Sequence, residues 1–308
     1  MQWPAPLTPG SRVALVAPSR QVLPSELEPF FQFCEAQRWQ VVFEPEDLYA
    51  SDGFFAGTDA HRGKILQEML DDARIQAIWV VRGGHGSSRI WPALRWDGFL
   101  RYPKWVIGFS DATPLLWGAV FAGVVALHGP VAVQVPHRLT KAALERLMGL
   151  LRGEDPLPLR WRRQPWHAWQ KGTAEGYLLG GNLSLLSTLV GTSLDYRHFG
   201  RPALLFWEEV GEYYYRLDRL LWHLRNAGWL HQSRGLLIGA HSVLSDDEAR
   251  PFSRTLKEMV ADATKDFGGP LAMGMPVGHV AENYPLPLGS WGCFVVEEAE
   301  VLLSFLRA

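Results

Sequence analysis

Apolar residues in the first half of the chain alternate between short continuous runs and longer stretches at helical spacing. Runs of four to six mostly apolar residues, typical of buried strands, occupy residues 12–17, 39–43, 76–81, 104–109 and 124–127. Apolar positions recur every three or four residues, as in helices, over residues 25–37, 59–70 and 141–151. Ser25 is the expected N-cap of the first helix. Strands that alternate with helices predict a mostly parallel sheet covered by helices on both faces.

The second half carries the same signals with more strand and turn. Strands are predicted at residues 203–207, 235–240 and beyond residue 271, and helices at residues 183–190, 213–227 and 248–264. We therefore predict an α/β protein of two domains. The first, residues 1–155, is a doubly wound, flavodoxin-like domain, and the second, residues 173–308, is a smaller α+β domain rich in strands.

Residues 156–172 break the alternation, and we place the domain linker there. The segment contains three prolines and the tryptophans Trp161, Trp166 and Trp169. Two roles are open for it. It is either a packed connector whose tryptophans cover a domain seam, or a flap over a substrate.

Composition narrows the function classes. With 308 residues and a net charge of −2, the chain has no basic field, so neither nucleic acid nor a membrane surface is an expected partner. Cys34 and Cys293 belong to no CxxC pair, and the ten histidines show no HExxH spacing, so we expect no disulfide framework and no metal site. The N-terminus lacks signal-peptide features and the longest apolar stretch, residues 114–127, is too short to span a bilayer. We expect a cytoplasmic protein.

Ser110 lies where a predicted strand ends and an apolar helix begins, in the segment Gly-Phe-Ser-Asp of residues 108–111. That position exposes the hydroxyl near the free N–H groups of a helix N-terminus, at the strand ends where open α/β sheets bind ligands. Ser110 is thus a candidate nucleophile, and equally a candidate N-cap. Position 112 is alanine, so the GxSxG elbow of ordinary α/β-hydrolases is absent.

A glycine-rich turn, residues 82–88, follows the strand at residues 76–81. It is open to three interpretations: a phosphate loop, an oxyanion hole for the serine one strand later, or simply a tight turn. Arg89 stands where GxGxxG has its third glycine, and the Gly-Lys of a P-loop is missing, which weakens the first interpretation. His85 in this turn is a candidate base or a solvated loop histidine.

Three acids, Glu208, Glu209 and Glu212, follow the predicted strand at residues 203–207. Glu209 and Glu212 fit the first turn of a helix, where carboxylates favour the helix dipole. Glu208 directly follows the apolar run, and a buried carboxylate there needs a partner. His279, among turn residues near the strand-rich end, is a suitable one.

In the same order along nearly the whole chain, these motifs resemble those of the LD-carboxypeptidase family, which includes muropeptide carboxypeptidases and microcin-C immunity peptidases. The matching segments are residues 12–18, 82–89, 108–113, 128–130, 180–184 with 191–192, 208–212 with 215–219, and 278–279 with 283 and 286–289. Each segment is a weak signal by itself, and the ordered set is specific.

The resemblance implies roles for individual residues. Ser110 is the expected nucleophile, Glu208 the triad acid and His279 the base, while the backbone N–H groups of Gly84 and Asp111 form the expected oxyanion hole. Because Ser110 precedes the linker and the other two follow it, we expect the triad to assemble at the domain interface.

Two departures from the family pattern bear on substrate contacts. His85 replaces the usual tyrosine of the glycine turn, and Trp207-Glu208-Glu209 replaces Leu-Glu-Asp. His85 and Trp207 are therefore candidate substrate contacts. Arg82 and Arg216 are candidates as well, because a guanidinium group can bind a substrate carboxylate.

The resemblance implies a serine carboxypeptidase that releases terminal D-alanine from a murein tetrapeptide during cell-wall recycling. Its partner is a small peptide, it needs no cofactor, and a homodimer is expected. One alternative is a peptidase of the same fold that hydrolyses peptide-nucleotide antibiotics, with the linker tryptophans stacked on the base. An alternative of another class is a non-catalytic protein that binds a nucleotide in the glycine turn.

Overall fold

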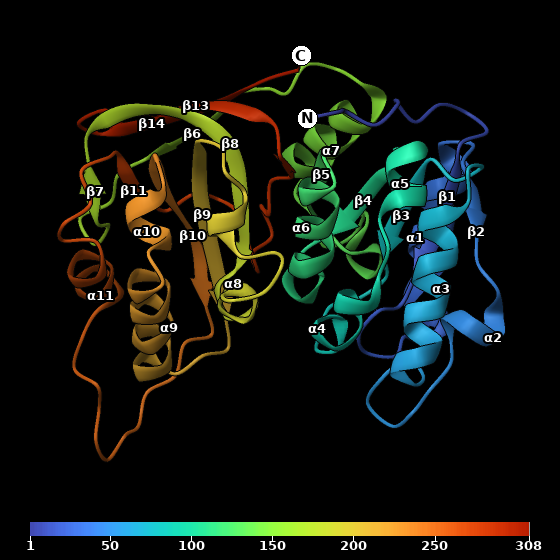
Figure 1. Cartoon of the computed structure of the whole chain (residues 1–308), viewed down its shortest axis with the longest axis horizontal. Helices are drawn as coiled ribbons and strands as arrows, with labels where there is room; N and C mark the ends of the chain where they lie inside the picture. The colour runs from blue at the N-terminus through green and yellow to red at the C-terminus, as the bar shows by residue number, and fades with distance from the viewer. Residues whose placement is uncertain (308) are drawn as a thin grey trace. The chain divides into compact units, whose positions relative to one another are not determined.

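The computed structural model describes residues 1–307 and divides the chain into two compact units (Figure 1). The first unit comprises Met1–Asp155 and Ala281–Gly289, and the second comprises Pro156–Val280 and residues 290–307. The short segment Ala281–Gly289 was expected in the second domain, and it returns instead to the first. Its strand completes the edge of the first sheet, which local sequence patterns do not reveal.

The first unit is built on a six-stranded sheet in the order β12-β5-β4-β3-β1-β2. Its strands are β1 (Arg12–Val16), β2 (Gln40–Val42), β3 (Ala77–Val80), β4 (Trp105–Gly108), β5 (Ala126–His128) and β12 (Leu286–Leu288). Strands β1 to β5 are parallel and β12 is antiparallel to β5. The order β2-β1-β3-β4-β5 is that of a flavodoxin-like, doubly wound sheet, which confirms the predicted class of this domain.

Helices connect these parallel strands. They are α1 (Pro24–Ala36), α2 (Pro45–Leu48), α3 (Asp59–Asp71), α4 (Ser87–Ile90), α5 (Asp97–Arg101), α6 (Thr113–Phe121) and α7 (Lys141–Arg152). The three helices predicted here from spacing are confirmed to within two residues, but Ser25 is not an N-cap. Leu23 holds that position, Pro24 fills the first helical position, and the Glu26 carboxylate accepts the Leu23 N–H (2.9 Å).

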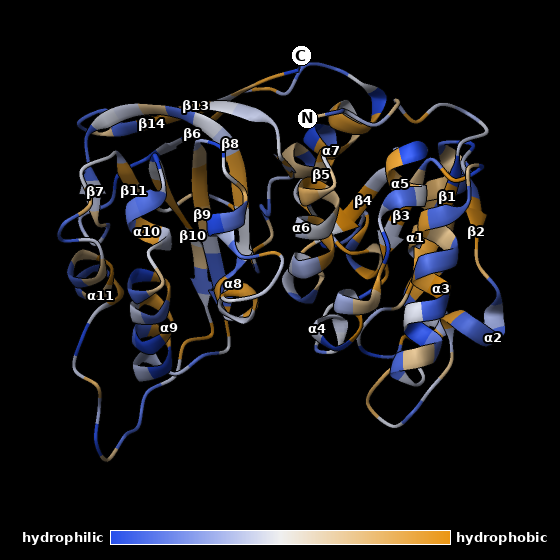
Figure 2. Ribbon diagram, viewed as in Figure 1, coloured by the Kyte–Doolittle hydropathy of each residue, from blue (hydrophilic) through white to orange (hydrophobic). Residues whose placement is uncertain are grey.

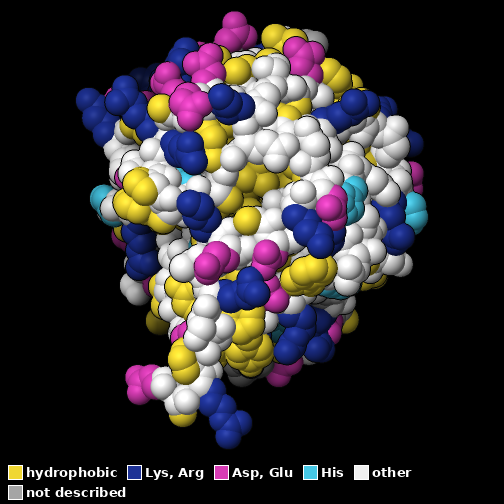
Figure 3. Space-filling model, turned by 90° about the vertical axis from the view of Figure 1, so that its left-hand side faces the viewer, with side chains coloured by type: hydrophobic (Ala, Val, Ile, Leu, Met, Phe, Trp, Pro, Cys, Tyr) yellow, Lys and Arg dark blue, Asp and Glu magenta, His cyan; other side chains and the backbone are white. Residues whose placement is uncertain are grey.

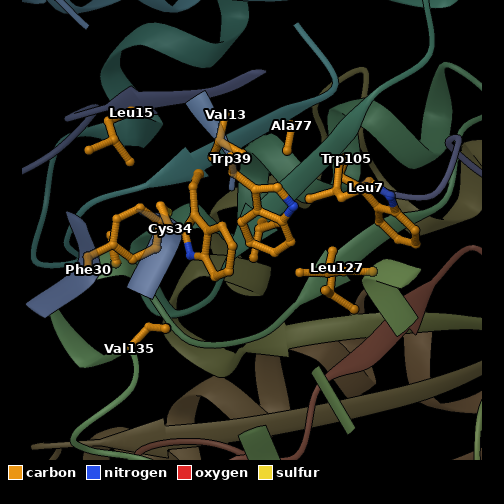
Figure 4. Close-up of a cluster of buried hydrophobic side chains, with 14 of the residues drawn as sticks. Leu7, Val13, Leu15, Phe30, Cys34, Trp39, Ala77, Trp105, Leu127 and Val135 are labelled. Atoms are coloured by element: carbon orange, nitrogen blue, oxygen red, sulfur yellow. The ribbon is translucent and has the colours of Figure 1, made fainter. Parts of the chain in front are cut away.

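Apolar side chains from the strands, α1 and α7 form one buried cluster in this unit (Figure 4). Hydrophobic residues colour the ribbon of β4, one of these strands, orange in Figure 2. Trp79 of β3 meets Phe30 of α1 edge to face at 4.9 Å, and its indole N–H donates to the Pro130 carbonyl (2.8 Å). Cys34 lies in the same cluster, where burial raises the pKa of its thiol to about 12. Full burial of such side chains contributes roughly 1.5–3 kcal/mol each, so this core fixes the strands whose ends carry the loops described below.

The second unit is built on an eight-stranded sheet in the order β6-β14-β13-β8-β9-β10-β11-β7. Its strands are β6 (Leu159–Arg162), β7 (Trp169–Gln170), β8 (Gly172–Asn182), β9 (Ala203–Val210), β10 (Gly235–Ser242), β11 (Leu271–Met273), β13 (Trp291–Val296) and β14 (Glu300–Leu306). Its helices are α8 (Leu183–Leu189), α9 (Tyr214–Asn226), α10 (Trp229–Gln232) and α11 (Leu256–Ala263). Only β8 to β11 are parallel, and the other pairings are antiparallel, so the unit is the strand-rich mixed domain that was predicted.

The segment predicted as a linker, residues 156–172, is part of this second sheet. It supplies β6 and β7, and β6 alternates buried Leu159 and Trp161 with exposed arginines, the pattern of a half-buried strand. The indole N–H of Trp161 donates to the Met273 carbonyl (3.0 Å) and that of Trp169 to the Glu297 carbonyl (2.7 Å). Two of the three tryptophans therefore anchor the strands.

The helix predicted over residues 248–264 is shorter in the structure. It begins only at Leu256, where Thr255 and Glu258 form a capping box. Pro251 lies within the span that was predicted as helix. Proline disfavours a helical conformation at the residue before it, so the helix does not extend through this part.

No helix among residues 1–307 has both the length and the apolar character needed to cross a bilayer. On the face shown in Figure 3, lysines and arginines are interspersed with aspartates and glutamates.

His241, near the end of β10, makes stability sensitive to pH. Its Nδ1 lies 3.1 Å from the Gly239 carbonyl, its Nε2 is shielded from solvent without a partner among the described residues, and burial lowers its pKa to about 4. An unfolded histidine titrates near 6.5, so the unfolded chain takes up a proton first as the pH falls. The stability contributed by neutral His241 is thus complete above pH 6.5 and is lost as the pH falls toward 4.

We expect His241→Asn to remove this loss. Between pH 7.5 and 4.5 the wild type should lose roughly 1–3 kcal/mol more unfolding free energy than the variant. Urea unfolding followed by tryptophan fluorescence at both pH values measures the difference. The exposed His137→Asn should behave like wild type. Identical pH dependence in all three proteins would contradict the assignment.

Candidate functional site

Ser110 lies in a strained turn at the carboxyl end of β4. Phe109 is extended, Ser110 itself has φ of +60°, and the short 3₁₀ turn Ser110–Ala112 leads into α6. A left-handed conformation at a non-glycine residue costs energy and is characteristic of functional turns. Ser110 caps neither helix, since the N-cap positions are Phe109 and Ala112, so the alternative in which it is simply an N-cap is wrong.

The glycine turn packs directly against this serine. A methyl group on Gly83 would lie 3.2 Å from both Cβ and Oγ of Ser110, and 3.9 Å from the backbone nitrogen of Asp111. Gly84 and Gly86 have φ of +120° and +144°, a region that favours glycine. The turn therefore needs its glycines both for its own path and for its approach to Ser110.

A buried carboxylate ties this turn to the serine loop. Asp111 is fully buried, and its Oδ2 accepts hydrogen bonds from the Ser19 hydroxyl and from the Ser87 backbone N–H (2.9 Å). The Ser87 hydroxyl donates to the Asp111 carbonyl. Ser19 follows β1, Ser87 follows β3 and Asp111 follows β4, so one side chain joins three loops. Sequence analysis placed Ser87 and Asp111 in motifs but did not single out Ser19, and it did not detect this role.

The two backbone N–H groups expected to form an oxyanion hole, those of Gly84 and Asp111, are both uncommitted in the described part of the chain. Within residues 1–307, neither the N–H of Gly84 nor that of Asp111 donates to an acceptor. The first belongs to the glycine turn and the second directly follows Ser110. Such uncommitted amides near a nucleophile can stabilise the negative charge that develops on an attacked carbonyl oxygen.

The charged candidates near the turn are mostly paired. Arg82 bonds to Glu26 (3.1 Å) and Arg89 bonds to Asp59 (2.7 Å), which argues against either as a free anion-binding group. His85 is exposed, and its ring lies 6.0 Å from that of Phe55.

The second unit holds an acid–histidine pair. Glu208 is fully buried in β9, and its Oε2 lies 2.7 Å from Nδ1 of His279, whose side chain is 21% exposed. Glu208 lies within the strand, not after it as expected. Because a carboxylate only accepts hydrogen bonds, Nδ1 carries the proton here, and Nε2 is the nitrogen that can take a proton from a nucleophile.

Glycines make room for this pair. A methyl group on Gly278, whose φ is +121°, would lie 2.8 Å from Oε2 of Glu208, and one on Gly239 would lie 3.2 Å from its Cβ. The Gly-His motif of residues 278–279 thus has a steric reason. The glycine lets the histidine approach the carboxylate.

Glu209, the next residue in β9, points to the opposite face and has a structural role. Its oxygens accept from the Asn182 amide (2.7 Å) and from the backbone N–H groups of Ser184 (2.7 Å) and Val210 (2.9 Å). Burial raises the pKa of its carboxyl, against these hydrogen bonds. Asn182 also caps α8, so this network fixes the start of that helix. The expected place of Glu209 in a helical turn is wrong, because β9 continues to Val210.

The remaining candidates differ in accessibility. Trp207 is fully buried, so its predicted substrate contact is wrong. A tryptophan inside the central strand β9 packs into the core. Arg216 is half-exposed, lies 4.0 Å from Glu212 and rests over the rings of Tyr213 and Tyr215.

Sequence comparison finds matches to two family models, the LD-carboxypeptidase N-terminal domain at residues 13–129 and the C-terminal domain at residues 175–293. A putative carboxypeptidase of Synechocystis sp. is 34% identical over 93% of this chain and 92% of its own length. The murein tetrapeptide carboxypeptidase of Pseudomonas aeruginosa is 32% identical over 90% of this chain and 91% of its own.

Solved structures share the fold. The muramoyltetrapeptide carboxypeptidase of Oxalobacter formigenes matches with a TM-score of 0.83 at 21% identity, over 96% of this chain and 99% of its own. A structure of MccF in complex with glutamyl sulfamoyl guanosine matches with a TM-score of 0.82 at 20% identity, over 98% of both chains. The microcin C7 self-immunity protein MccF of Escherichia coli is 23% identical over 92% of this chain and 90% of its own length.

Replacing Gly83 by alanine should impair Ser110 selectively. The added methyl group would crowd the Ser110 hydroxyl at 3.2 Å, so we expect kcat/KM for peptide hydrolysis to fall about 100-fold without loss of folding. Gly63→Ala is the matched control, since its methyl group meets only Ile90 at 3.9 Å. Equal activity of the two variants would show that the glycine turn does not set the position of the serine.

Substitutions of the two adjacent glutamates should have opposite effects, one on catalysis and the other on stability. Glu208→Gln should lower kcat about 10³- to 10⁴-fold, because the imidazolium loses its partner, with little change in unfolding free energy. Glu209→Gln places an amide N–H₂ against donors, so it should cost roughly 1–3 kcal/mol of stability and keep kcat within a few-fold. Steady-state kinetics and urea unfolding of both variants measure this. The reverse pattern would exchange the two roles.

Proposed function

The chain belongs to the LD-carboxypeptidase family, and we propose that it is a serine carboxypeptidase that releases the terminal D-alanine of a murein tetrapeptide. Its family and its carboxypeptidase relatives make it a peptidase that acts on peptide substrates. The observation that carries the finer proposal is the buried Glu208–His279 hydrogen bond (2.7 Å), in a chain whose Ser110 has the strained backbone of a nucleophile turn.

We assign the first chemical step to Ser110. Its Oγ attacks the carbonyl carbon of the L–D peptide bond while Nε2 of His279 takes the hydroxyl proton. Glu208 keeps the imidazole in the required tautomer and stabilises the imidazolium. The negative oxygen of the tetrahedral intermediate accepts hydrogen bonds from the N–H groups of Gly84 and Asp111, which have no acceptor among the described residues.

His279 then protonates the nitrogen of the departing D-alanine, and the C–N bond breaks to leave an acyl ester on Ser110. Water attacks this ester, with His279 as base, and the shortened peptide leaves. The N–H groups that stabilise the first intermediate serve the second one equally. Every catalytic group in these steps is a side chain or a backbone N–H group of this chain, and water supplies the second nucleophile.

The microcin-like alternative has a specific basis in the likeness to MccF, a self-immunity protein with a bound glutamyl sulfamoyl guanosine. For this chain, stacking on a nucleobase by the three tryptophans is weakly supported. Trp161 and Trp169 are bonded to backbone carbonyls of their own unit, and Trp166, at 66% exposure, is the most exposed of the three. A protein that only binds nucleotides has no use for the Glu208–His279 pair. The cytoplasmic location and the homodimer remain predictions, to be checked by cell fractionation and sedimentation.

The direct test uses the purified protein and L-Ala-γ-D-Glu-meso-diaminopimelate-D-Ala, with free D-alanine followed by mass spectrometry. We expect release by the wild type and a loss on the order of a million-fold in Ser110→Ala. Ser187→Ala, a serine-to-alanine change in α8, is the matched control and should keep full activity.

Absence of D-alanine release by the wild type would overturn the muropeptide assignment. Hydrolysis of an aminoacyl sulfamoyl adenosine in its place, lost in Ser110→Ala, would establish the microcin-like alternative. Release that persists in Ser110→Ala would remove the serine mechanism.

A further inference from the structure

The arginines around the glycine turn differ in what they bind. Arg82 is bonded to Glu26, Arg89 to Asp59, and the buried Arg62 to Asp59 and the Pro18 carbonyl. These charges are therefore already committed.

Arg20 is the exception. Its guanidinium forms no ion pair and donates no hydrogen bond within residues 1–307, and it rests over the ring of Phe54, 5.6 Å from the centroid. Glu26 is near enough to feel its charge, but that carboxylate is bonded to Arg82 and to the Leu23 N–H.

The backbone of Arg20 is held firmly. It pairs with Phe55 in an antiparallel bridge, and the neighbouring Ser19 accepts the Ala56 N–H at its carbonyl (3.1 Å) while its hydroxyl bonds to Asp111. Arg20 itself is exposed. An arginine with a fixed stem and an exposed, uncommitted head is suited to bind an anion from solution.

Its stem starts beside the expected oxyanion donor. A methyl group on Gly84 would lie 3.0 Å from Cβ of Arg20 and 3.7 Å from its Cδ. One residue earlier, a methyl group on Gly83 would lie 3.2 Å from Oγ of Ser110. The glycine turn therefore separates the nucleophile from Arg20 by little more than its own thickness.

A carboxypeptidase needs an anion-binding group at this place. The scissile carbonyl and the terminal carboxylate belong to successive residues, and one residue spans only roughly 3.5 Å. When the scissile oxygen is bonded to the Gly84 N–H, the terminal carboxylate must lie within one residue of it, inside the reach of an arginine side chain rooted there.

We propose that Arg20 binds the terminal carboxylate of the substrate and so restricts cleavage to the last peptide bond. This rests on the proposed function and deepens it. The guanidinium fork matches a carboxylate in two hydrogen bonds, and an amide or a continuing chain offers no such charge.

The experiment compares the tetrapeptide ending in D-alanine with the same peptide ending in D-alaninamide. For the acid, Arg20→Gln should lower kcat/KM roughly 30- to 300-fold, mainly through KM. For the amide, the same substitution should change kcat/KM less than threefold. Arg20→Lys should retain an intermediate preference for the acid, because it keeps the charge and loses the fork.

Arg74→Gln is the matched control, since Arg74 is an exposed arginine bonded to Asp72 ahead of β3, and it should leave both substrates unaffected. Unfolding midpoints of all variants should agree, because Arg20 is exposed. Equal losses on both substrates, or no loss on either, would overturn the role of Arg20 while the proposed function stands. A wild type inactive on both substrates would instead overturn the proposed function, and this inference with it.

Discussion

The buried carboxylate of Asp111 makes the hydrogen bonds on which the loops around Ser110, the proposed nucleophile, depend. It accepts hydrogen bonds from Ser19 after β1 and from Ser87 after β3, and its own backbone follows Ser110 after β4. A polar group this deeply buried is costly unless it is hydrogen-bonded, so separating the three loops would leave the buried Asp111 side chain without these partners. Through Ser19 the same contact holds the backbone of Arg20, and through Ser87 it holds the end of the glycine turn.

In the second unit, the alternation of side chains along a strand places the important carboxylates. Glu208 and Glu209 are neighbours in β9, yet their side chains point to opposite faces. One meets His279 and the other fastens the start of α8 through Asn182 and Ser184. Two identical side chains thus acquire different chemistry because of the parity of their positions, and a shift of one residue in the strand would exchange them.

The parallel sheet of the first unit could be predicted because its strands are short apolar runs separated by helices, and such strands are buried on both faces. The strands within residues 156–172 could not be predicted, and a linker was expected there. The strand β6 has only four residues, and its alternation of Leu159 and Trp161 with arginines lies among prolines. The return of Ala281–Gly289 to the first unit could not be predicted from the sequence either, because the pairing of β12 with β5 joins residues far apart in the chain. Ser25 failed as a cap because Pro24 occupies the first helical position beside it.

By itself, the chain of residues determined the domain classes, the identity of the reactive serine, acid and histidine as candidates, and the glycines that let them approach their neighbours. These depend on local spacing and on the order of motifs. Tertiary structure alone decided which charges are committed. It paired Arg82 with Glu26 and left Arg20 without a carboxylate beside Gly84. It also decided that Trp207, a candidate substrate contact, is buried in the core. Pairing of charges depends on which loops meet at a sheet edge, and no local pattern of residues encodes that meeting.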